Sequence, residues 1–312
     1  MYEIQLKQII TIYFPNINMI ENGNKDIEKN LYRETVNYET VKEQYNNLIK
    51  TIKKLSPITR IHNLVNYISF GNITKCDNIP NIFFIRDSFI ATDKGIWITK
   101  MKEETRHLET IYIEKILIKM GLNIYGISTK GYLEGGDVYL MNNKYCIIGT
   151  GPRSNYEGAL EFINENKYLF EKFIIVYPEV EDTDMHRIHL DCIFAMLDRF
   201  KCILWKGSIT DKSKPYYRYI DEYILDDNEN LYKNKSKISF FDYLIKEDIN
   251  VIPISDESQK NYGCNILNLG NNKILVQDEE TFRKITYSTY VDLSEVHKMY
   301  GGIHCITNTS SI

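Results

Sequence analysis

Four stretches of the chain share one order of polar and apolar positions. Each begins with polar residues, continues as a short apolar run, reverses at a polar turn such as "DKG" or "GNNK", and returns as a second apolar run. Apolar runs joined by turn-forming residues are typical of β-hairpins. The stretches with this order are residues 83–106, 132–153, 187–208 and 263–284. The pattern therefore predicts four hairpins of one kind.

Helix-like segments separate these hairpins. We expect helices at roughly 104–120, 154–165, 238–247 and 278–285. Ser154 and Glu157 have the spacing of a capping box, and Ser239 precedes another amphipathic run. A further unit is predicted from a strand within 3–15, a helix at 37–55 and a final strand within 301–308.

The spacing of charged residues also repeats. Asp87 and Arg106 lie 19 positions apart, and so do Glu134 and Arg153. About five ββα units in a ring would bring the polar start of every hairpin to one central opening. The alternative is an ordinary mixed α/β domain with unrelated hairpins, in which these side chains would lie far apart.

Composition narrows the class of protein. The 312 residues are 43% apolar, which is enough for a substantial core in one large domain or two ordinary ones. A net charge of −4 gives no general attraction to nucleic acid or to anionic membranes. The amino-terminal residues are too interrupted by charge for a signal peptide, and no apolar run approaches the ~20 residues of a membrane span. We expect a soluble, cytoplasmic protein without nucleic-acid or membrane partners.

The cysteines fit that location. None forms a CxxC pair, and most lie inside apolar runs, which indicates reduced thiols and not a disulfide framework. They are Cys76, Cys146, Cys192, Cys202, Cys264 and Cys305.

Residues able to do chemistry gather at the predicted hairpin starts and near the chain end. They are Asp87, Glu134, His189, Asp191 and Cys305. A thiolate can attack an electrophilic carbon while an imidazole moves protons. Nearby carboxylates would raise the pKa of the thiol. A cationic, planar substrate with several N–H donors resolves this conflict, because carboxylates bind it and its charge stabilises the thiolate. A guanidinium group fits that description.

Each of these residues also has an ordinary interpretation. Cys305 alone could be a core thiol, Asp87 could pair with Arg86, and Gly135 and Gly136 could form a β-bulge. His186, His189 and Asp191 are metal-ligand types, but no second cluster completes them, so we expect no metal and no cofactor.

The motifs "NIFFIRD", "LEGGDV", "HLDCIFAMLD" and "GGIHCIT" occur in this order and resemble those of the guanidino-modifying enzymes, most closely the arginine deiminases. The resemblance covers most of residues 4–308 and is weakest at 15–75 and 208–260. It implies the pentein fold, a five-bladed pseudo-symmetric α/β-propeller.

The resemblance also implies a role for each matching residue. Cys305 would be the nucleophile and His189 the general acid and base. Asp87, Asp191 and Glu134 would hold the guanidinium group. The residues expected to bind the rest of the substrate are Arg106 and Arg153, which would receive its α-carboxylate, and Asn81 and Phe84, which would line the pocket.

Two departures limit the resemblance. Long arginine deiminases carry a sizeable helical insertion, whereas only one helix, around 38–55, fits here. We therefore expect a single catalytic domain over residues 1–312, nearer in size to dimethylargininases and arginine dihydrolases. Many bacterial deiminases also have an arginine just before the terminal Gly-Gly, where this chain has Tyr300.

The expected activity is hydrolysis of L-arginine to L-citrulline and ammonia through a covalent thiouronium intermediate. The alternatives are an arginine dihydrolase that releases ornithine, a methylarginine hydrolase, an agmatine deiminase and an amidinotransferase. A non-catalytic pentein that binds a guanidino ligand is a further alternative. The expected partner is a small guanidino compound, and a homo-oligomer is left open.

Overall fold

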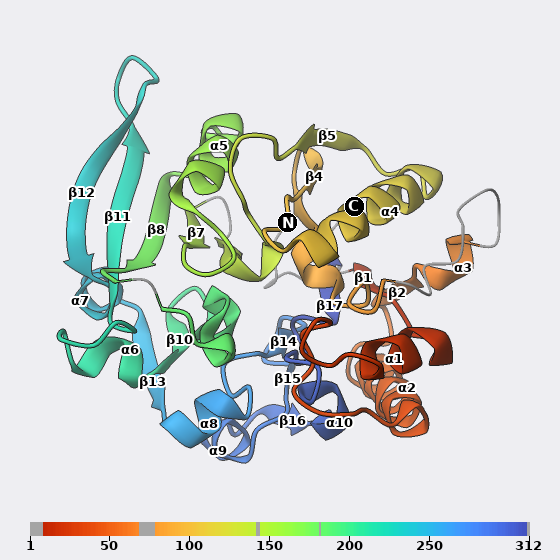
Figure 1. Ribbon diagram of the computed structural model, residues 1–312. Helices are drawn as coiled ribbons and strands as arrows, with labels where there is room; N and C mark the ends of the chain where they lie inside the picture. Colours follow the sequence, from red (N-terminus) through yellow and green to blue (C-terminus); the bar gives the residue numbers. More distant parts are fainter. Residues whose placement is uncertain (1–8, 69–78, 142–143, 181, 311–312) are drawn as a thin grey trace.

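Five small sheets surround the centre of the protein in a computed structural model (Figure 1). The structure describes residues 9–68, 79–141, 144–180 and 182–310. In every sheet, one strand pairs antiparallel with one neighbour and parallel with another. The predicted five-bladed α/β-propeller is confirmed, because the same three-stranded unit recurs five times in the described chain.

Four units come from the predicted hairpins, each followed by a helix and a parallel strand. The first has strands β3 (Phe89–Thr92), β4 (Gly95–Ile98) and β5 (Ile124–Ile127), with helix α4 (His107–Lys119). The second has β6 (Val138–Met141), β7 (Tyr145–Gly149) and β8 (Lys172–Pro178), with α5 (Tyr156–Asn166).

The other two units follow the same order. One has β9 (Phe194–Asp198), β10 (Lys201–Trp205) and β13 (Asn250–Ile254), with α7 (Phe240–Lys246). The other has β14 (Leu267–Asn268), β15 (Ile274–Val276) and β16 (Ser288–Tyr290), with α9 (Glu279–Lys284).

The fifth unit joins the two ends of the described chain. Strand β1 (Ile9–Ile12) pairs parallel with β2 (Arg60–Asn63) and antiparallel with β17 (Thr307–Ser310), so that Ile9 lies opposite Ser310. Helices α1 (Ile17–Asn24) and α2 (Tyr38–Leu55) lie between β1 and β2. The predicted last strand begins only at Thr307, because residues 302–307 form a tight turn in which the Ile306 N–H donates to the Gly302 carbonyl.

One hairpin was not predicted from the sequence. Strands β11 (Arg218–Leu225) and β12 (Leu231–Ser239) extend the β6–β8 sheet at the edge of β8 and project from the body of the protein (Figure 1). The remaining short helices are α3 (Val65–Ile68), α6 (Gly207–Thr210), α8 (Asp256–Lys260) and α10 (Ser294–His297).

The predicted helix starts are correct in one case and wrong in another. The Ser239 hydroxyl accepts the Asp242 N–H at the start of α7, as expected. Helix α5 is instead capped by Asn155, whose side chain accepts the Gly158 N–H. Ser154 is not the cap, because its hydroxyl accepts the Glu134 N–H and donates to Asp137.

Polar turns precede three of the hairpins at the centre of the ring. Each is a short 3-10 turn: Ile85–Ser88 before β3, Gly135–Asp137 before β6 and Leu190–Cys192 before β9. The apolar side chains behind them form three separate clusters, so each group of blades has its own core. In the described part of the chain, no helix is long and apolar enough to cross a membrane.

Candidate active site

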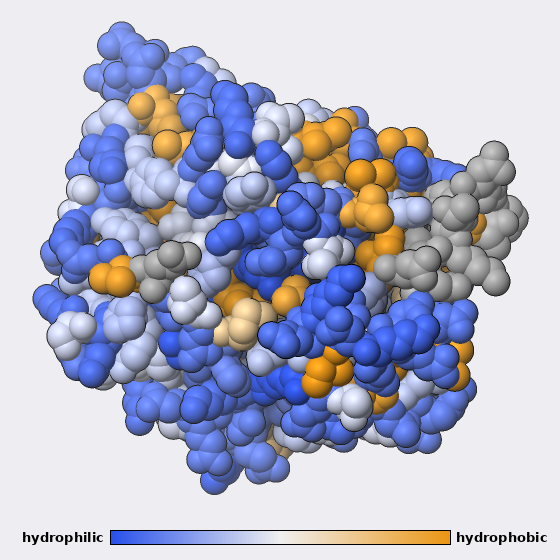
Figure 2. Space-filling model, in the orientation of Figure 1, coloured by the Kyte–Doolittle hydropathy of each residue, from blue (hydrophilic) through white to orange (hydrophobic). Residues whose placement is uncertain are grey.

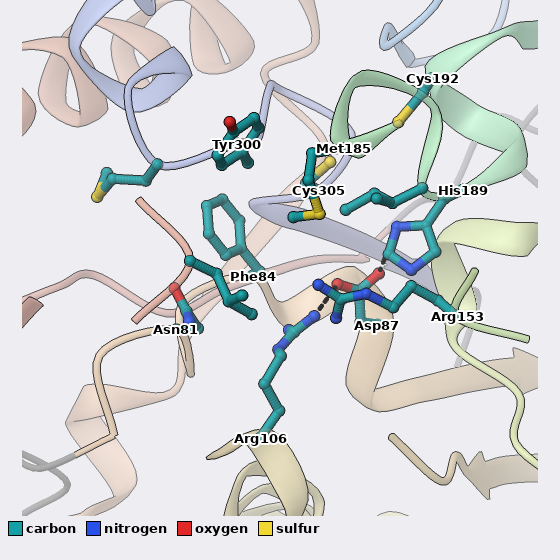
Figure 3. A pocket seen from close by; sticks show the side chains of 13 residues that line it. Asn81, Phe84, Asp87, Arg106, Arg153, Met185, His189, Cys192, Tyr300 and Cys305 are labelled. Atoms are coloured by element: carbon teal, nitrogen blue, oxygen red, sulfur yellow. Dashed lines mark hydrogen bonds and ion pairs between the residues drawn. The ribbon is translucent and has the colours of Figure 1, made fainter. Parts of the chain in front are cut away.

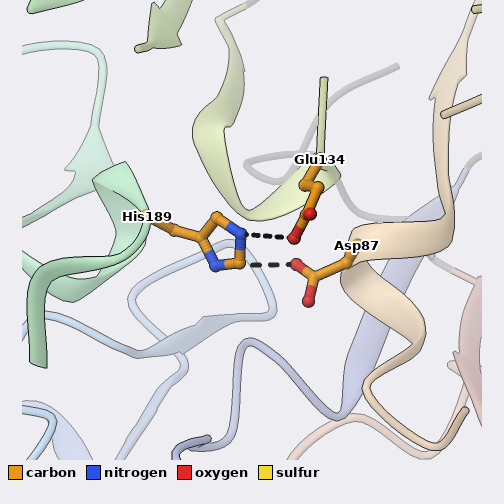
Figure 4. A group of neighbouring side chains, drawn as sticks. All are labelled: Asp87, Glu134 and His189. Carbon is orange, nitrogen blue, oxygen red and sulfur yellow. Dashed lines mark hydrogen bonds and ion pairs between the residues drawn. The ribbon is translucent and has the colours of Figure 1, made fainter. Parts of the chain in front are cut away.

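Asp87, Glu134 and His189 meet although they come from three different units (Figure 4). His189 Nε2 lies 2.8 Å from Glu134 Oε2, and its Nδ1 lies 3.8 Å from Asp87 Oδ1. All three side chains are buried, with exposed fractions of 4% or less. The ring of blades therefore brings the predicted hairpin starts together, as the repeat pattern indicated.

The two glycines after Glu134 make this approach possible. A Cβ atom on Gly135 would lie 2.1 Å from the Arg86 carbonyl oxygen, and one on Gly136 would lie 2.9 Å from Asp87 Oδ1. The Gly136 N–H also donates to Asp87 Oδ1 over 3.2 Å. Any side chain at either position would push the first two turns apart.

Cys305 and Asp191 form the other part of the site. Cys305 Sγ lies 3.7 Å from Asp191 Oδ2, and Asn265 Nδ2 donates to the sulfur over 3.1 Å. His304 Nδ1 lies 2.7 Å from the same Asp191 oxygen and so orients that carboxylate. Sequence reasoning missed Asn265 and His304, although Asn265 stands at the start of the fourth predicted hairpin.

One pocket contains most of these groups (Figure 3). The pocket is partly open to solvent, and its atom-free space of about 400 Å³ includes part of that open solvent. Its charged side holds the thiol, the imidazole and the predicted arginines, and its other side is mainly apolar or aromatic. The lining residues are Leu31, Asn81, Phe84, Asp87, Arg106, Arg153, Met185, Ile188, His189, Cys192, Met299, Tyr300 and Cys305.

Arg106 binds protein carboxylates on two sides. Its Nε and Nη2 donate to the two oxygens of Glu109 over 2.9 and 2.8 Å, and its Nη1 donates to Asp87 over 2.9 Å. Nη1 also lies 3.4 Å from Glu134 Oε2. Arg106 thus holds the carboxylates of the site in place and occupies one oxygen of Asp87. Glu109 is a site neighbour that the sequence pattern did not reveal, because it reads as an ordinary polar residue in a helix.

Arg153 and Asn81 keep polar atoms that no described residue engages by a hydrogen bond. Arg153 Nη1 lies 3.7 Å from Glu134 Oε2 and is buried without a hydrogen bond. Asn81 Nδ2 donates to the Asn30 carbonyl, whereas its buried Oδ1 has no partner. Unsatisfied buried polar groups are uncommon in folded proteins, and those in a pocket offer partners to a ligand.

The surrounding charges act differently on the imidazole of His189 and on the thiol of Cys305. Burial favours a neutral His189, but Asp87, the hydrogen bond to Glu134 and Asp137 outweigh it and raise the pKa of His189 to about 10. Burial would also raise the pKa of Glu134, but Arg153, His189 and Arg106 lower it to about 2. His189 is therefore an imidazolium ion at neutral pH.

The thiol is in the opposite situation. Burial, together with Asp191 and Asp87, raises the pKa of Cys305 well above its usual range. The site thus holds a neutral thiol until a positive charge enters beside the carboxylates. This is the conflict that the sequence analysis anticipated, and it favours a cationic ligand.

A metal ion is the competing occupant. Ligand atoms of Asp87, Glu134 and His189 lie within 4.8 Å of one another. Arg106 and Arg153 already place positive charge on these carboxylates, which disfavours a further cation with two charges. The half-site considered from the sequence does not form, because His186 Nδ1 lies 2.9 Å from Asp184 and Asp191 pairs with His304.

Comparisons with known proteins agree with this geometry. The profile of the arginine deiminase family matches residues 15–309. An arginine deiminase from Listeria innocua is 24% identical over 257 residues, which cover 74% of this chain and 61% of that protein. One from Borrelia garinii is 29% identical over 150 residues, which cover 45% of this chain and 35% of that protein. The chain thus matches less than two thirds of the length of either relative.

Two solved structures share the fold. A mutant dimethylarginine dimethylaminohydrolase from Pseudomonas aeruginosa, complexed with citrulline, has a TM-score of 0.67 at 19% identity and covers 98% of this chain and 99% of that chain. The N-terminal domain of a cyanobacterial arginine dihydrolase, bound to its substrate, has a TM-score of 0.67 at 16% identity and covers 99% of this chain and 100% of that chain.

Proposed function

Because the chain belongs to the arginine deiminase family, we propose that it hydrolyses the guanidinium group of L-arginine to give L-citrulline and ammonia. The observation that carries this proposal is a pocket lined by the Cys305 thiol, the His189 imidazolium ion and the Asp87 carboxylate. The Glu134 and Asp191 carboxylates do not line the pocket, but they contact His189 and Cys305 from the protein side. A guanidinium group matches these carboxylates in charge and in donor geometry. Over residues 1–312 the chain would act as one catalytic domain.

Cys305 would attack the guanidinium carbon. The substrate's positive charge between Asp87 and Asp191 offsets the carboxylates that raise the pKa of the thiol, so the thiol releases its proton to solvent and becomes a thiolate when the substrate is bound. The attack makes a carbon–sulfur bond and a tetrahedral adduct. His189, already protonated, gives its proton to the departing nitrogen as the carbon–nitrogen bond breaks. Ammonia leaves, and the substrate remains on the sulfur as a thiouronium.

Water would complete the reaction. His189, now neutral, removes a proton from the water that adds to the thiouronium carbon. The carbon–sulfur bond then breaks, the hydroxyl proton of the adduct passes to the departing sulfur and restores the neutral thiol, and the ureido group of citrulline is released. Glu134 stabilises the imidazolium form through its 2.8 Å contact and therefore favours the return of His189 to its starting state.

The α-carbon end of the substrate would lie where the aromatic side of the pocket meets its arginines. Arg153 Nη1 is available to the α-carboxylate, and Asn81 Oδ1 is available to the α-ammonium group. Arg106 could bind the α-carboxylate only after its Nη1 has released Asp87. The guanidinium group of the substrate would then take the place of Arg106 at the Asp87 carboxylate. Phe84 and Tyr300 enclose the aliphatic stem.

Product analysis tests the proposal. Purified protein is incubated separately with L-arginine, agmatine, a methylarginine, and arginine plus glycine, and the products are identified by mass spectrometry. Citrulline from arginine alone is expected. Ornithine would identify an arginine dihydrolase, the activity named for one of the similar structures. Guanidinoacetate from arginine plus glycine would identify a transferase, and no turnover of any compound would contradict an enzymatic role.

A cytoplasmic location accompanies this proposal. All five cysteines among the described residues are free and buried, which is compatible with a reducing compartment. Cys76 lies outside the described residues.

A further inference from the structure

Arg33 lies behind the aromatic wall of the pocket. It belongs to the loop between α1 and α2, and its guanidinium carbon lies 4.7 Å from the centre of the Tyr300 ring and 5.2 Å from that of Tyr262. Its Nη2 donates to the Tyr262 hydroxyl over 3.1 Å. Since Tyr300 lines the pocket, a full positive charge stacks on the outer face of a pocket wall.

Among the described residues, no acidic side chain neutralises the charge of Arg33. No carboxylate among the described residues forms an ion pair with it, and its buried Nε has no hydrogen-bond partner. Arg106 and Arg153, the two arginines that line the pocket, both lie near carboxylates. A partly buried cation without a counter-ion is energetically unfavourable, so binding of an anion near Arg33 would be stabilising.

Three residues close to Arg33 have unfavourable backbone dihedral angles. Leu31, Tyr262 and Tyr300 all have left-handed backbone conformations, with φ of 60°, 62° and 58°. Such conformations are unfavourable for side chains of this size and persist where the surroundings impose them, often at ligand sites. Two of these three residues, Leu31 and Tyr300, line the pocket.

The loop that carries Arg33 is tied to the loop that carries the nucleophile. The Arg33 N–H donates to the Lys298 carbonyl over 2.7 Å, seven positions before Cys305. On the other side of the loop, the Asn30 carbonyl accepts from Asn81. Arg33 is therefore held in a fixed place relative to both ends of the pocket.

We propose that Arg33, stacked on Tyr300, determines specificity for substrates that carry an anionic group at the end opposite the guanidinium. This inference rests on the proposed function and refines it. The carboxylates at the base of the pocket bind the cationic end, and Arg33 gives the mouth a positive potential that favours a carboxylate. Tyr300 has no charge of its own, so the positive charge at this wall is supplied by the neighbouring loop.

The test compares L-arginine with agmatine, which has the same guanidinium group and no carboxylate. Steady-state kcat and KM are measured for the wild type, Arg33→Ala, Arg33→Lys and the control Arg60→Ala, which removes one charge from an exposed strand position. Arg33→Ala should raise KM for arginine about tenfold or more, with kcat changed less than about threefold. KM for agmatine should change less than about threefold, Arg33→Lys should recover part of the loss, and Arg60→Ala should resemble the wild type.

Equal increases of KM for both substrates would overturn the inference, because they would mean that Arg33 only supports the loop. An unchanged KM for arginine would overturn it as well. Where Arg33→Ala does not fold by circular dichroism, Arg33→Gln, which keeps the length and removes the charge, decides between these outcomes. Where agmatine is bound but not turned over, its dissociation constant for Cys305→Ala protein replaces KM.

Failure of the proposed function is a separate outcome. It would appear in the wild type as no turnover of either compound, whereas failure of this inference leaves wild-type turnover of arginine intact.

Discussion

Buried carboxylates occur in two regions of this protein, and their partners differ. In the β11–β12 hairpin, Asp221 and Glu222 receive hydrogen bonds from tyrosine hydroxyls and from Lys233 and Lys235, whose side chains are 40% and 36% exposed. In the pocket, the carboxylates face arginine side chains that are only 3% to 5% exposed.

The difference lies in what each region leaves unsatisfied. Asp221 accepts from Tyr156, Tyr177, Ser236 and the Lys237 N–H, besides Lys233, so its oxygens are fully used. The lysines of β12 also keep this edge strand charged, which discourages pairing with another chain, and the tip of the projecting hairpin is hydrophilic (Figure 2). The pocket instead retains an unpaired donor, an unpaired acceptor and a neutral thiol. The carboxylates of the hairpin thus have all their partners within the protein, whereas the pocket keeps hydrogen-bonding groups that a ligand could use.

The largest expected effect comes from the nucleophile. Cys305→Ala should lower turnover of arginine by roughly three orders of magnitude or more, because it removes the thiol that would form the covalent intermediate. Its thermal unfolding temperature should stay within a few degrees of the wild type. Cys146→Ala, which changes a core thiol on β7, is the matched control and should retain turnover. Turnover by the Cys305→Ala variant would contradict the mechanism through a thiouronium intermediate.

Equivalent substitutions of two fully buried glutamates sharpen the comparison. Glu134→Gln should lower kcat about a hundredfold or more, because it removes the anion that keeps His189 protonated. Glu222→Gln should leave kcat near the wild type and lower the free energy of unfolding by about 1 to 3 kcal/mol, since it breaks a buried network.

The same pair predicts a change with pH. The pKa of His189 is raised to about 10 by Asp87, Glu134 and Asp137 against the effect of burial. Glu134→Gln should therefore shift the alkaline limb of the kcat–pH profile to lower pH by a unit or more, because less imidazolium remains at high pH. Identical profiles for both glutamine variants would mean that Glu134 does not control the proton on His189.

A smaller effect is expected for the arginine that has a free donor. Arg153→Ala should raise KM for arginine about ten- to a hundredfold, since a charge-assisted contact contributes roughly 1.5 to 3 kcal/mol. KM for agmatine should change much less. Lys233→Ala, which removes a lysine from the β11–β12 hairpin, should change KM for neither arginine nor agmatine. Parallel losses on both substrates in the Arg153 variant would argue against a carboxylate pocket.

Arg106→Ala should behave differently from Arg153→Ala. Since Arg106 binds Glu109 and Asp87 in the free protein, its removal should lower the unfolding temperature as well as raise KM. An Arg106→Ala variant of unchanged stability would contradict the inference that the ion pairs of Arg106 with Glu109 and Asp87 stabilise the folded protein.

The smallest effect concerns stability and pH. Burial raises the pKa of Asp137 to about 7 despite His189, Ser154 and the Leu190 N–H. The folded state thus holds a proton that the unfolded chain has lost, so this contribution to stability is present below pH ~4 and is lost as the pH rises toward 7. Asp137→Asn should reduce the fall in unfolding temperature between pH 5 and pH 8 by a few degrees.

Asp221 should show the opposite dependence. Burial raises its pKa, but Lys233, Tyr156 and the Lys237 N–H outweigh burial and lower the pKa to about 2. Its contribution to stability is present above pH ~4 and is lost as the pH falls toward 2. Asp221→Asn should therefore reduce stability at neutral pH, and the deficit relative to the wild type should shrink in acid. Equal pH profiles for the two asparagine variants would contradict the contrast between the regions.

The sequence predicted what repeats and missed what does not. The equal spacing from Asp87 to Arg106 indicated two copies of one unit, and the structure places that pair in direct contact. The β11–β12 hairpin was missed because β12 alternates lysine with short polar residues and the hairpin has no counterpart in the other units. Periodicity reports local elements, and this hairpin exists only as an extension of one sheet.

The supporting residues of the site were harder to predict. Glu109 lies on a helix where a glutamate is common, and only the folded ring shows that it faces Arg106. Arg33 carries no motif, and its place beside Tyr300 depends on two loops that are more than 260 positions apart. Such contacts depend on packing between units, so no pattern within a single segment contains them.

The pairing of β1 with β17 has a consequence for how the protein is made. Residues 9–12 leave the ribosome first among the described strands, yet their partner strand is synthesised almost 300 residues later. Contacts of such sequence separation form slowly, because a long loop must close first. Cys305 stands two residues before β17, so the proposed nucleophile reaches its place only as the ring closes. On the proposed mechanism, a nascent or carboxyl-terminally shortened chain would be inactive, however well its earlier blades had folded.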